Sequence, residues 1–329
     1  MNDLALIKAK INTLPVEDQK EMLDLIVELE EAKEREESRV DFLTFVRKMW
    51  PAFIGGRHHE VMADAFERVA NGELKRLIVN MPPRHTKSEF ASYLFPAWYL
   101  GRYPEKKIIQ TAHTAELAVG FGRKVRNLIG QDDFQSVFPG IELSSDSKAA
   151  GRWNTNKRGD YFAIGVGGAV TGKGADVLII DDPHSEQDAA LGAYNPEVYE
   201  KTYEWYTSGP RQRLQPGGAI IIVMTRWSTR DLTGKIIKSV TQKEGVDEWE
   251  VIELPAIMPS GQPLWPEFWP IDQLESLKAE LPVSKWSAQY QQNPTSEEGP
   301  LIKREWWRIG KDRTRRRVKP SFKAGIPRF

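Results

Sequence analysis

Residues 76–88 combine a short apolar run with a polar loop that ends in Lys-Ser. Arg76–Asn80 reads as a buried strand, Met81 to Ser88 (MPPRHTKS) reads as a tight loop, and a helical stretch follows. This is the layout of a phosphate-binding loop, in which backbone N–H groups and a helix N-terminus hold phosphates. The lysine reaches the β/γ oxygens and the hydroxyl binds Mg²⁺. We therefore predict phosphate binding by Lys87 and Mg²⁺ binding by Ser88.

The loop departs from the usual glycine pattern at two positions. Met81 and Thr86 stand where glycines are expected. Thr86 matters more, because the residue before the lysine must let the backbone approach phosphate closely and a β-branched side chain crowds that approach. Taken alone, the segment is therefore also compatible with an ordinary strand–helix turn that contains Lys-Ser.

A second apolar run, Asp176–Asp181, ends in two adjacent carboxylates, Asp181 and Asp182. At the carboxyl end of a central parallel strand, the first acid faces the Mg²⁺ hydration shell, and the second can orient or deprotonate an attacking water. Metal-dependent nuclease chemistry could use the same pair. The upstream Lys-Ser loop favours a nucleotide as the substrate.

A third apolar run, Ala219–Thr225, ends in Thr-Arg. On a strand beside the phosphate loop, Thr225 could sense the γ-phosphate and pass its loss to a neighbouring element. For Arg226 and Trp227, a simple strand cap or turn is the alternative. The three strand ends in this order predict a nucleotide hydrolase that uses ATP and Mg²⁺.

Short apolar runs alternate with longer amphipathic stretches from Asp41 onward, which predicts an α/β domain with a largely parallel sheet. The further expected strands are Lys107–Ala112, Tyr161–Gly165 and Trp249–Leu254. The expected helices are Ala52–Asn71, Ser88–Leu100, Thr114–Gly130, Pro196–Ser208, Arg230–Val240, Gln273–Leu281 and Ser284–Gln292.

The amino-acid composition excludes several classes of protein. The 329 residues include no cysteine and five histidines, which excludes disulfide scaffolds, thiol catalysis and Cys-ligated metal sites. Neither a long apolar run nor a signal-peptide pattern is found, so we expect an intracellular protein without a membrane partner. The net charge of zero is a cancellation: residues 17–37 hold ten acids against three bases, and residues 303–329 hold eleven bases against two acids.

Several segments together resemble the large terminase subunits of tailed bacteriophages, over about residues 41–310. The segments that carry the resemblance are RLIVNMPPRHTKSE (76–89), GKGADVLIIDDP (172–183), TRWSTRDL (225–232), LPAI (254–257), LWP (264–266), AQYQQNP (288–294) and KREW (303–306). The resemblance implies a three-layer αβα P-loop NTPase of RecA-like type, in the additional-strand, catalytic-acid class, with a central mostly parallel sheet. It also implies an ATPase that translocates double-stranded DNA into a procapsid.

The resemblance assigns roles position by position. Asp181 orders the Mg²⁺ shell with Ser88, Asp182 positions the attacking water, and Thr225 belongs to the motif that couples hydrolysis to movement. Arg84 matches a basic residue that terminases place early in a deviant phosphate loop.

The remaining candidates for ATP binding lie in the same loop and upstream of it. Pro83, His85 and Thr86 complete the loop, and Lys87 holds phosphate. His59, with His58 before it, lies where helicase-like motors place an adenine-contacting segment; an ordinary exposed surface turn is the alternative.

Lys173 lies between Gly172 and Gly174, at a position that is typically Arg in similar sequences. We expect it to supply a cation across a subunit boundary to the transferring phosphoryl group, with Arg152 and Arg158 as rival candidates. Lys173→Ala should then suppress the ATPase of the assembled ring much more than nucleotide binding. Unchanged turnover in the ring would contradict this role.

The expected organisation has three parts. Residues 1–40 form an acidic helical segment, 41–295 an ATPase domain with a Trp/Pro-rich lid subdomain, and 296–329 a linker and basic tail. Residues 311–329 show no strand pattern and no carboxylate cluster of the kind expected for the family's nuclease domain. We therefore expect ATP hydrolysis without DNA cleavage by this chain.

The resemblance also implies partners: double-stranded DNA, the portal protein of the procapsid and the small terminase subunit, in the host cell cytoplasm. We expect a homo-oligomeric ring when docked, with a pentamer as its form and a monomer in solution as an alternative. Two other functions stay open. One is a helicase-like nucleic-acid translocase, and the other is a nucleotide-binding assembly protein that does not hydrolyse ATP.

Overall fold

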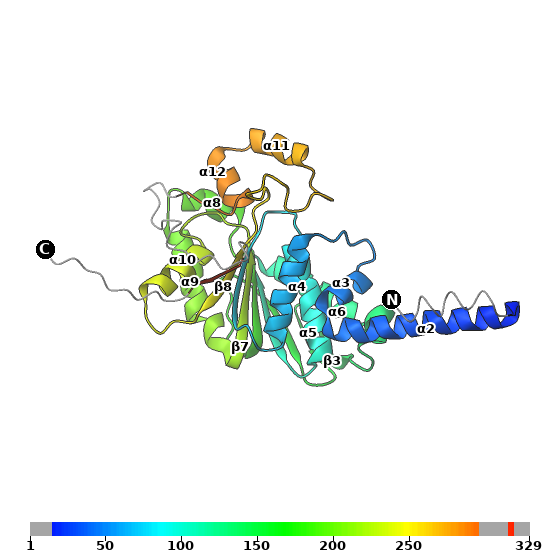
Figure 1. Cartoon of the computed structure of the whole chain (residues 1–329). Coiled ribbons are helices and arrows are strands. Elements are labelled where there is room, and N and C mark those ends of the chain that lie inside the picture. The colour runs from blue at the N-terminus through cyan, green and yellow to red at the C-terminus, as the bar shows by residue number, and fades with distance from the viewer. Residues whose placement is uncertain (1–14, 296–314, 319–329) are drawn as a thin grey trace.

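The computed structural model describes residues 15–295 and 315–318 (Figure 1). Their strands form one sheet with the order β3-β4-β5-β2-β6-β7-β1-β8-β9. The strands are β1 (Arg76–Asn80), β2 (Lys107–Ala112), β3 (Leu143–Ala149), β4 (Arg152–Thr155), β5 (Asp160–Gly165), β6 (Ala175–Asp181), β7 (Leu214–Met224), β8 (Trp249–Glu253) and β9 (Arg315–Val318).

Helices connect these strands and cover both faces of the sheet. The α-helices are α2 (Val16–Val40), α3 (Phe42–Met49), α4 (Arg57–Ala70), α5 (Phe95–Arg102), α6 (Ala115–Ile129), α7 (Asp132–Val137), α8 (Glu186–Gly192), α9 (Glu197–Ser208), α10 (Leu232–Gln242), α11 (Ile271–Glu280) and α12 (Val283–Lys285). The π-helical segments are η1 (Glu89–Leu94) and η3 (Trp286–Tyr290), and η2 (Pro210–Arg213) is a 3₁₀ turn.

The six central strands, from β5 to β8 in the sheet order, run parallel to their neighbours. β7 lies between β1 and β6, with Val223 aligned with both Val79 and Asp181. It is therefore an additional strand between the phosphate-loop strand and the carboxylate strand. The predicted α/β class, with a mostly parallel central sheet and an additional strand, is confirmed.

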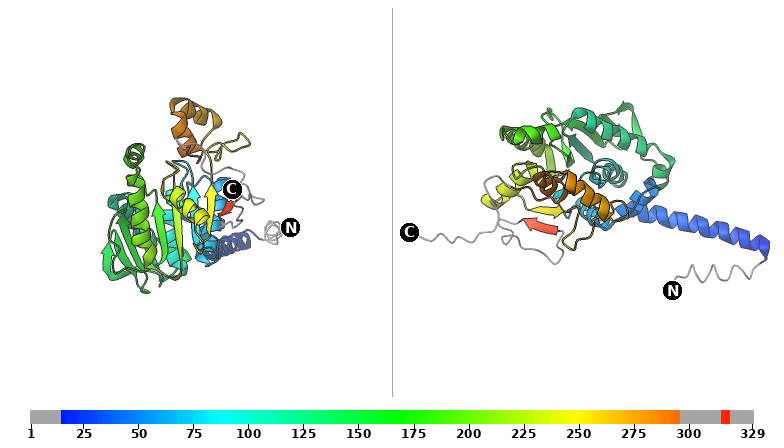
Figure 2. Two further views of the ribbon diagram at one scale, coloured as in Figure 1. Left: turned by 90° about the vertical axis from the view of Figure 1, so that its left-hand side faces the viewer. Right: turned by 90° about the horizontal axis from the view of Figure 1, so that it is seen from above.

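Alternate residues of the strands pack into two separate cores. Leu77 and Val79 of β1 face the cluster that contains α3 to α7, whereas Ile78 faces the cluster that contains α9 and α10. This alternation follows from the two-residue period of a strand, and it places helices on both faces of the sheet (Figure 2). The predicted three-layer arrangement is therefore correct.

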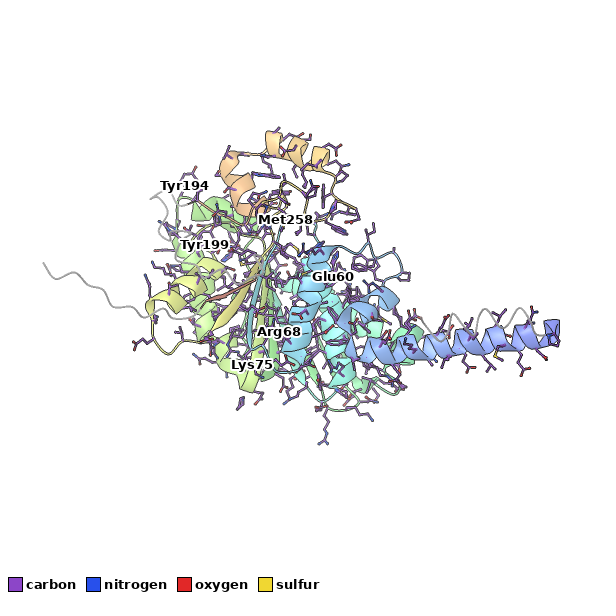
Figure 3. All side chains as sticks on the ribbon, in the orientation of Figure 1. Glu60, Arg68, Lys75, Tyr194, Tyr199 and Met258 are labelled. Carbon is purple, nitrogen blue, oxygen red and sulfur yellow. The ribbon has the colours of Figure 1, made fainter. Side chains whose placement is uncertain are left out.

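Packing against the sheet fixes the helix that carries the two predicted adenine-site histidines. Arg68 of α4, labelled in Figure 3, donates to both carboxylate oxygens of Glu250 on β8, at 2.9 and 2.6 Å. Such a bidentate pair sets orientation as well as distance. The N-terminus of α4, with His58 and His59, consequently meets the carboxyl edge of the sheet.

Two structural features differ from the sequence-based expectations. β3 and β4 pair antiparallel at one edge, and β9 pairs antiparallel with β8 at the other. The expectation that residues 311–329 carry no strand is thus wrong for Arg315–Val318; the rest of the predicted basic tail lies outside the described residues. β3 and β9 are edge strands, which pair on one side only, and β4 lies between β3 and β5 but has only four residues, so none of the three shows a long apolar run in the sequence.

Helix α2 projects from the body of the protein and is anchored at its C-terminal end (Figure 1). Trp98 donates its indole N–H to the carbonyl of Ser38, and Arg39 donates to the carbonyl of Val137. Leu25 and Leu29 remain exposed along the helix. No helix in the described part of the chain has the length and apolar character needed to cross a membrane.

After β8 the chain forms the lid, which we define as residues 255–293. It carries α11, α12 and η3, and it has its own small core of Ala256, Leu274 and Trp286. Figures 1 and 2 show the lid above one end of the sheet. The loop that follows β1 lies at this end of the sheet.

Phe42 joins several helices on one face of the sheet, and its truncation tests how much this aromatic core contributes to stability. Its ring lies 5.2–5.9 Å from those of Phe66, Phe90, Phe95 and Trp98, centroid to centroid. Phe42→Ala should lower the free energy of unfolding by about 3–5 kcal/mol through the cavity it leaves. Leu29→Ala, at an exposed position, should change it by less than about 0.5 kcal/mol. Urea denaturation measures both; equal effects would contradict the prediction.

Candidate nucleotide-binding site

The predicted phosphate loop lies at the carboxyl end of β1. Its backbone has a positive φ at Arg84 (62°) and Thr86 (67°), and helical structure begins at Lys87. A positive φ is uncommon for non-glycine residues and costs on the order of 1–3 kcal/mol. The loop is therefore held by its surroundings in a conformation that glycine would adopt without strain.

The side chains of the loop point in different directions. Arg84 is exposed, whereas His85 and Lys87 are buried. His85 Nδ1 lies 2.8 Å from the carbonyl oxygen of Pro83 and so donates its proton to it. This hydrogen bond closes a tight turn from Pro83 to His85, directly before Lys87.

Thr86 is tied to α4 by a hydrogen-bond chain. Gly56 N donates to His59 Nδ1 at 2.9 Å, so Nδ1 carries no proton and Nε2 must be the donor in the neutral ring. Nε2 lies 2.7 Å from Thr86 Oγ1, which in turn donates to the carbonyl of His85 at 2.5 Å. His59 therefore braces the residue that precedes Lys87.

The alternative that His58 and His59 form an ordinary exposed turn is wrong. Both lie in the first turn of α4 and are almost fully buried, because the helix end packs beneath the loop. Desolvation by burial lowers the pKa of His58 to about 2 and that of His59 to about 3, so both rings are neutral at pH 7. The adenine contact of His59 stays a prediction; both of its ring nitrogens are used within the protein.

The predicted Mg²⁺ residues lie side by side. Ser88 Oγ donates to Asp181 Oδ1 at 2.9 Å, and Ser92 Oγ donates to Asp181 Oδ2 at 2.7 Å. Gln110 Nε2 donates to Ser92 Oγ at 2.9 Å, which leaves the serine proton for Asp181. Burial, and then the neighbouring Asp182, raise the pKa of Asp181 well above its usual range.

These residues fit a divalent cation of the Mg²⁺ type. Mg²⁺ prefers oxygen ligands and binds through one or two carboxylates together with substrate phosphates. The Asp181 carboxylate and the Ser88 hydroxyl supply such oxygens beside the phosphate loop. Burial, and then the charge of Asp182, raise the pKa of Asp181, and a cation bound there would favour its charged form. Within the described residues, no group of three His, Cys, Asp or Glu side chains forms a separate metal site.

Asp182 connects three strand ends. Lys87 Nζ lies 2.9 Å from its Oδ2, and Thr225 N donates to its Oδ1 at 2.8 Å. Thr225 Oγ1 also donates to the carbonyl of Met81 at 3.1 Å, at the start of the phosphate loop. Asp182 itself has a positive φ of 40°, which aims its carboxylate toward the lysine. The structure thus brings together Lys87, Asp182 and Thr225, as the three motifs predict.

Lys173 lies apart from this cluster. It precedes β6, so it sits at the amino end of the strand whose carboxyl end carries Asp181. Its ammonium lies 2.7 Å from Asp160 Oδ2 and 5.3 Å from the centre of the Phe162 ring. The rival candidates Arg152 and Arg158 are exposed. Action across a subunit boundary stays a prediction for all three, and for Lys173 it would require loss of the pair with Asp160.

Several residues of the site were not identified from the sequence. Ser92 and Gln110 lie inside apolar elements, where pattern analysis assigns them to the core. Asp231 accepts hydrogen bonds from Gly234 N at the start of α10 and from buried Arg226. Burial alone would raise the pKa of Asp231, but the Arg226 guanidinium outweighs it and the pKa is lowered. A helix-capping signal, Asp before the apolar residues of α10, could have revealed Asp231.

The lid contacts the phosphate loop through two tryptophans. Trp269 donates its indole N–H to the carbonyl of Arg84 at 3.5 Å and stacks on His85, with ring centres 6.0 Å apart. Trp265 packs against His58 at 5.2 Å. Both tryptophans therefore pack against rings of the protein itself. A separate hollow of about 320 Å³ in the lid, lined by Lys278, Trp286 and their neighbours, contains none of the predicted site residues.

The parallel sheet order and the loop after β1 together define an α/β protein with a P-loop fold. No protein-family model matches the chain. Over 168 residues, half of the chain, it is 25% identical to "Terminase, large subunit" of Enterobacteria phage T3, and the match covers 28% of that relative. This confirms the resemblance to large terminase subunits, over a minor part of the relative's length.

Two solved structures are also similar to the chain. The HK97 bacteriophage large terminase matches with a TM-score of 0.49 and 11% identity, over 80% of this chain and 57% of that one. A mutant of the large terminase ATPase domain of Thermus phage P74-26 matches with a TM-score of 0.46 and 13% identity, over 76% of this chain and 98% of that one.

The buried neutral histidines predict a pH dependence of stability. Because the pKa of His58 is about 2 in the folded state, against an ordinary histidine value of 6.5, the unfolded chain binds the extra proton as the pH falls below about 6.5. The free energy of unfolding should then fall by up to about 1.4 kcal/mol per pH unit for each such histidine.

The substitution His58→Leu removes the contribution of one histidine to the pH dependence of stability. Neither ring nitrogen of His58 has a hydrogen-bond partner, so an apolar side chain should leave the stability near neutral pH within about 1 kcal/mol of the original. Urea denaturation between about pH 5 and pH 7.5 should give a shallower slope for the variant. Equal slopes in both proteins would contradict the assignment.

Proposed function

We propose that the chain is the ATP-hydrolysing motor part of a phage large terminase. One observation carries this proposal: Ser88 bonded to Asp181 and Lys87 paired with Asp182 join the phosphate loop to the carboxylate strand across β7. This is the constellation that phosphoryl transfer requires, with a cationic side chain, a metal-binding pair and a carboxylate within reach of water.

The pair of Lys87 and Asp182 implies an exchange of partners when ATP binds. The β- and γ-phosphate oxygens would attract the ammonium away from Asp182 Oδ2. Asp182, still held by Thr225 N, would then face the water that attacks the γ-phosphorus and accept its proton. The bond from the γ-phosphorus to the β–γ bridging oxygen breaks, which gives ADP and phosphate. Mg²⁺, held by Ser88 and Asp181, would offset the phosphate charge.

Thr225 offers a route from hydrolysis to movement. It donates from its backbone to Asp182 and from its hydroxyl to the start of the loop at Met81. A change in the position of Asp182 on loss of the γ-phosphate would therefore act on β7 and on the loop together. Arg84, exposed on the loop, is the proposed basic residue toward the nucleotide.

The biological partners follow from the relative rather than from the site. The T3 protein is named as a large terminase subunit, and the 25% identity over 168 residues supports the same role here. We propose double-stranded DNA, the portal of a procapsid and the small terminase subunit as partners. The working form would be a homo-oligomeric ring in the host cytoplasm, with Lys173, Arg152 or Arg158 as its cation in trans.

Substitutions at Asp182 and Lys87 separate chemistry from binding. Asp182→Asn should lower ATP turnover by about 10²-fold or more while nucleotide affinity is retained, because the general base is lost. Lys87→Ala should weaken ATP binding itself, since the phosphates lose their cation. Asp133→Asn, at an exposed site on α7, is the matched control and should behave as the original protein.

The measurement is ATP turnover with and without double-stranded DNA and empty procapsids, alongside nucleotide binding. Stimulation by procapsids is expected for the motor. Strand separation would indicate a helicase-like translocase instead. Intact binding with no turnover under any condition would indicate a nucleotide-binding assembly protein and would refute the hydrolytic role.

A further inference from the structure

The phosphate loop does without glycine at its tightest position. Thr86 precedes Lys87 and has a φ of 67°, in the left-handed region that disfavours a β-branched side chain. Its carbonyl accepts from Phe90 N at 3.0 Å and so belongs to the first turn of the following helix. The position of Lys87 and Ser88 depends on the backbone of Thr86. Contacts with the rest of the protein must therefore hold Thr86 in this conformation.

The side chain of Thr86 has a donor and an acceptor partner, and both are fixed. His59 Nε2 lies 2.7 Å from Oγ1 and donates to it, and Oγ1 donates to the carbonyl of His85 at 2.5 Å. The second bond closes a small local ring around the strained residue. The first bond reaches across 27 positions of sequence to another helix.

His59 is itself immobilised. Its Nδ1 accepts from Gly56 N at 2.9 Å, and its ring stacks on Phe90 with the centres 4.9 Å apart. Trp265 of the lid packs edge-on at 5.1 Å. A Cβ atom at Gly56 would lie 2.7 Å from Trp265 Cδ1, so glycine is needed for this close approach. Burial keeps the ring neutral, and the Gly56 N–H bonded to Nδ1 leaves the single ring proton on Nε2.

We propose that His59 is a positioning residue of the phosphate loop, whose Nε2 hydrogen bond to Thr86 replaces the conformational freedom that glycine gives to other phosphate loops. Its role is mechanical: it keeps the loop amides and Lys87 aimed at phosphate before the ligand arrives. The proposal rests on the proposed function for the identity of that ligand.

A set of paired variants tests the proposal. Thr86→Val keeps the shape and removes the hydroxyl, and His59→Asn keeps an acceptor for Gly56 but removes the distal donor. Each should weaken the binding of ATP with Mg²⁺ about tenfold, the size of one hydrogen bond in a fixed network, and the double variant should be no worse than either. His59→Gln, which restores a distal donor, should recover most of the affinity.

The variant Thr86→Gly tests whether glycine at this position makes the hydrogen bond from His59 unnecessary. With glycine the loop no longer needs the bond, so His59→Asn in the Thr86→Gly background should change ATP affinity by less than about twofold. A structural role of His59 in folding alone would instead lower affinity or stability equally in both backgrounds. An equal loss in both, or original affinity in Thr86→Val, would overturn the proposal.

A readout without nucleotide separates this proposal from the proposed function. Amide hydrogen exchange of residues 84–88 should become faster in Thr86→Val and His59→Asn, and His59→Asn should add nothing in the Thr86→Gly background. If the original protein binds no ATP but shows this pattern, the proposed function fails and the positioning role stands. Unchanged exchange in both single variants would refute the positioning role.

Discussion

Two adjacent carboxylates at the end of the central strand β6 are the constraint on which the rest of the site depends. Asp181 is fully buried, and Asp182 beside it adds a second negative charge. The structure offsets this charge with two serine hydroxyls on Asp181 and with the ammonium of Lys87 on Asp182. These contacts require that β6 and the loop after β1 end at the same edge, which the parallel order β6-β7-β1 provides.

The same edge concentrates backbone strain. Arg84, Thr86 and Asp182 all have positive φ angles, and each carries or adjoins a group of the site. Surrounding elements hold these conformations: α4 through His59, β7 through Thr225 and the lid through Trp269. Strain of this kind persists where the surroundings over-determine it, which is typical of sites that are preorganised for a ligand.

The lid and α4 act on the loop as one support. Trp265 contacts both histidines at the start of α4, and Trp269 contacts His85 in the loop. A movement of residues 255–293 would therefore change the contacts that hold the phosphate loop. The exposed face of α2 lies far from this region in the cartoon and takes no part in the support (Figure 1).

The sequence alone determined the central strands, the Lys-Ser loop, the Asp-Asp pair and the threonine that follows β7, because buried parallel strands read as continuous apolar runs with chemistry at their ends. It did not reveal the edge strands β3 and β9 or the short strand β4 beside β3, which lack that signal. Only the tertiary structure decided that His59 braces Thr86, that Lys87 pairs with Asp182 and that Lys173 pairs with Asp160. Hydrogen bonds and ion pairs between distant segments depend on distance and direction, which no local pattern encodes.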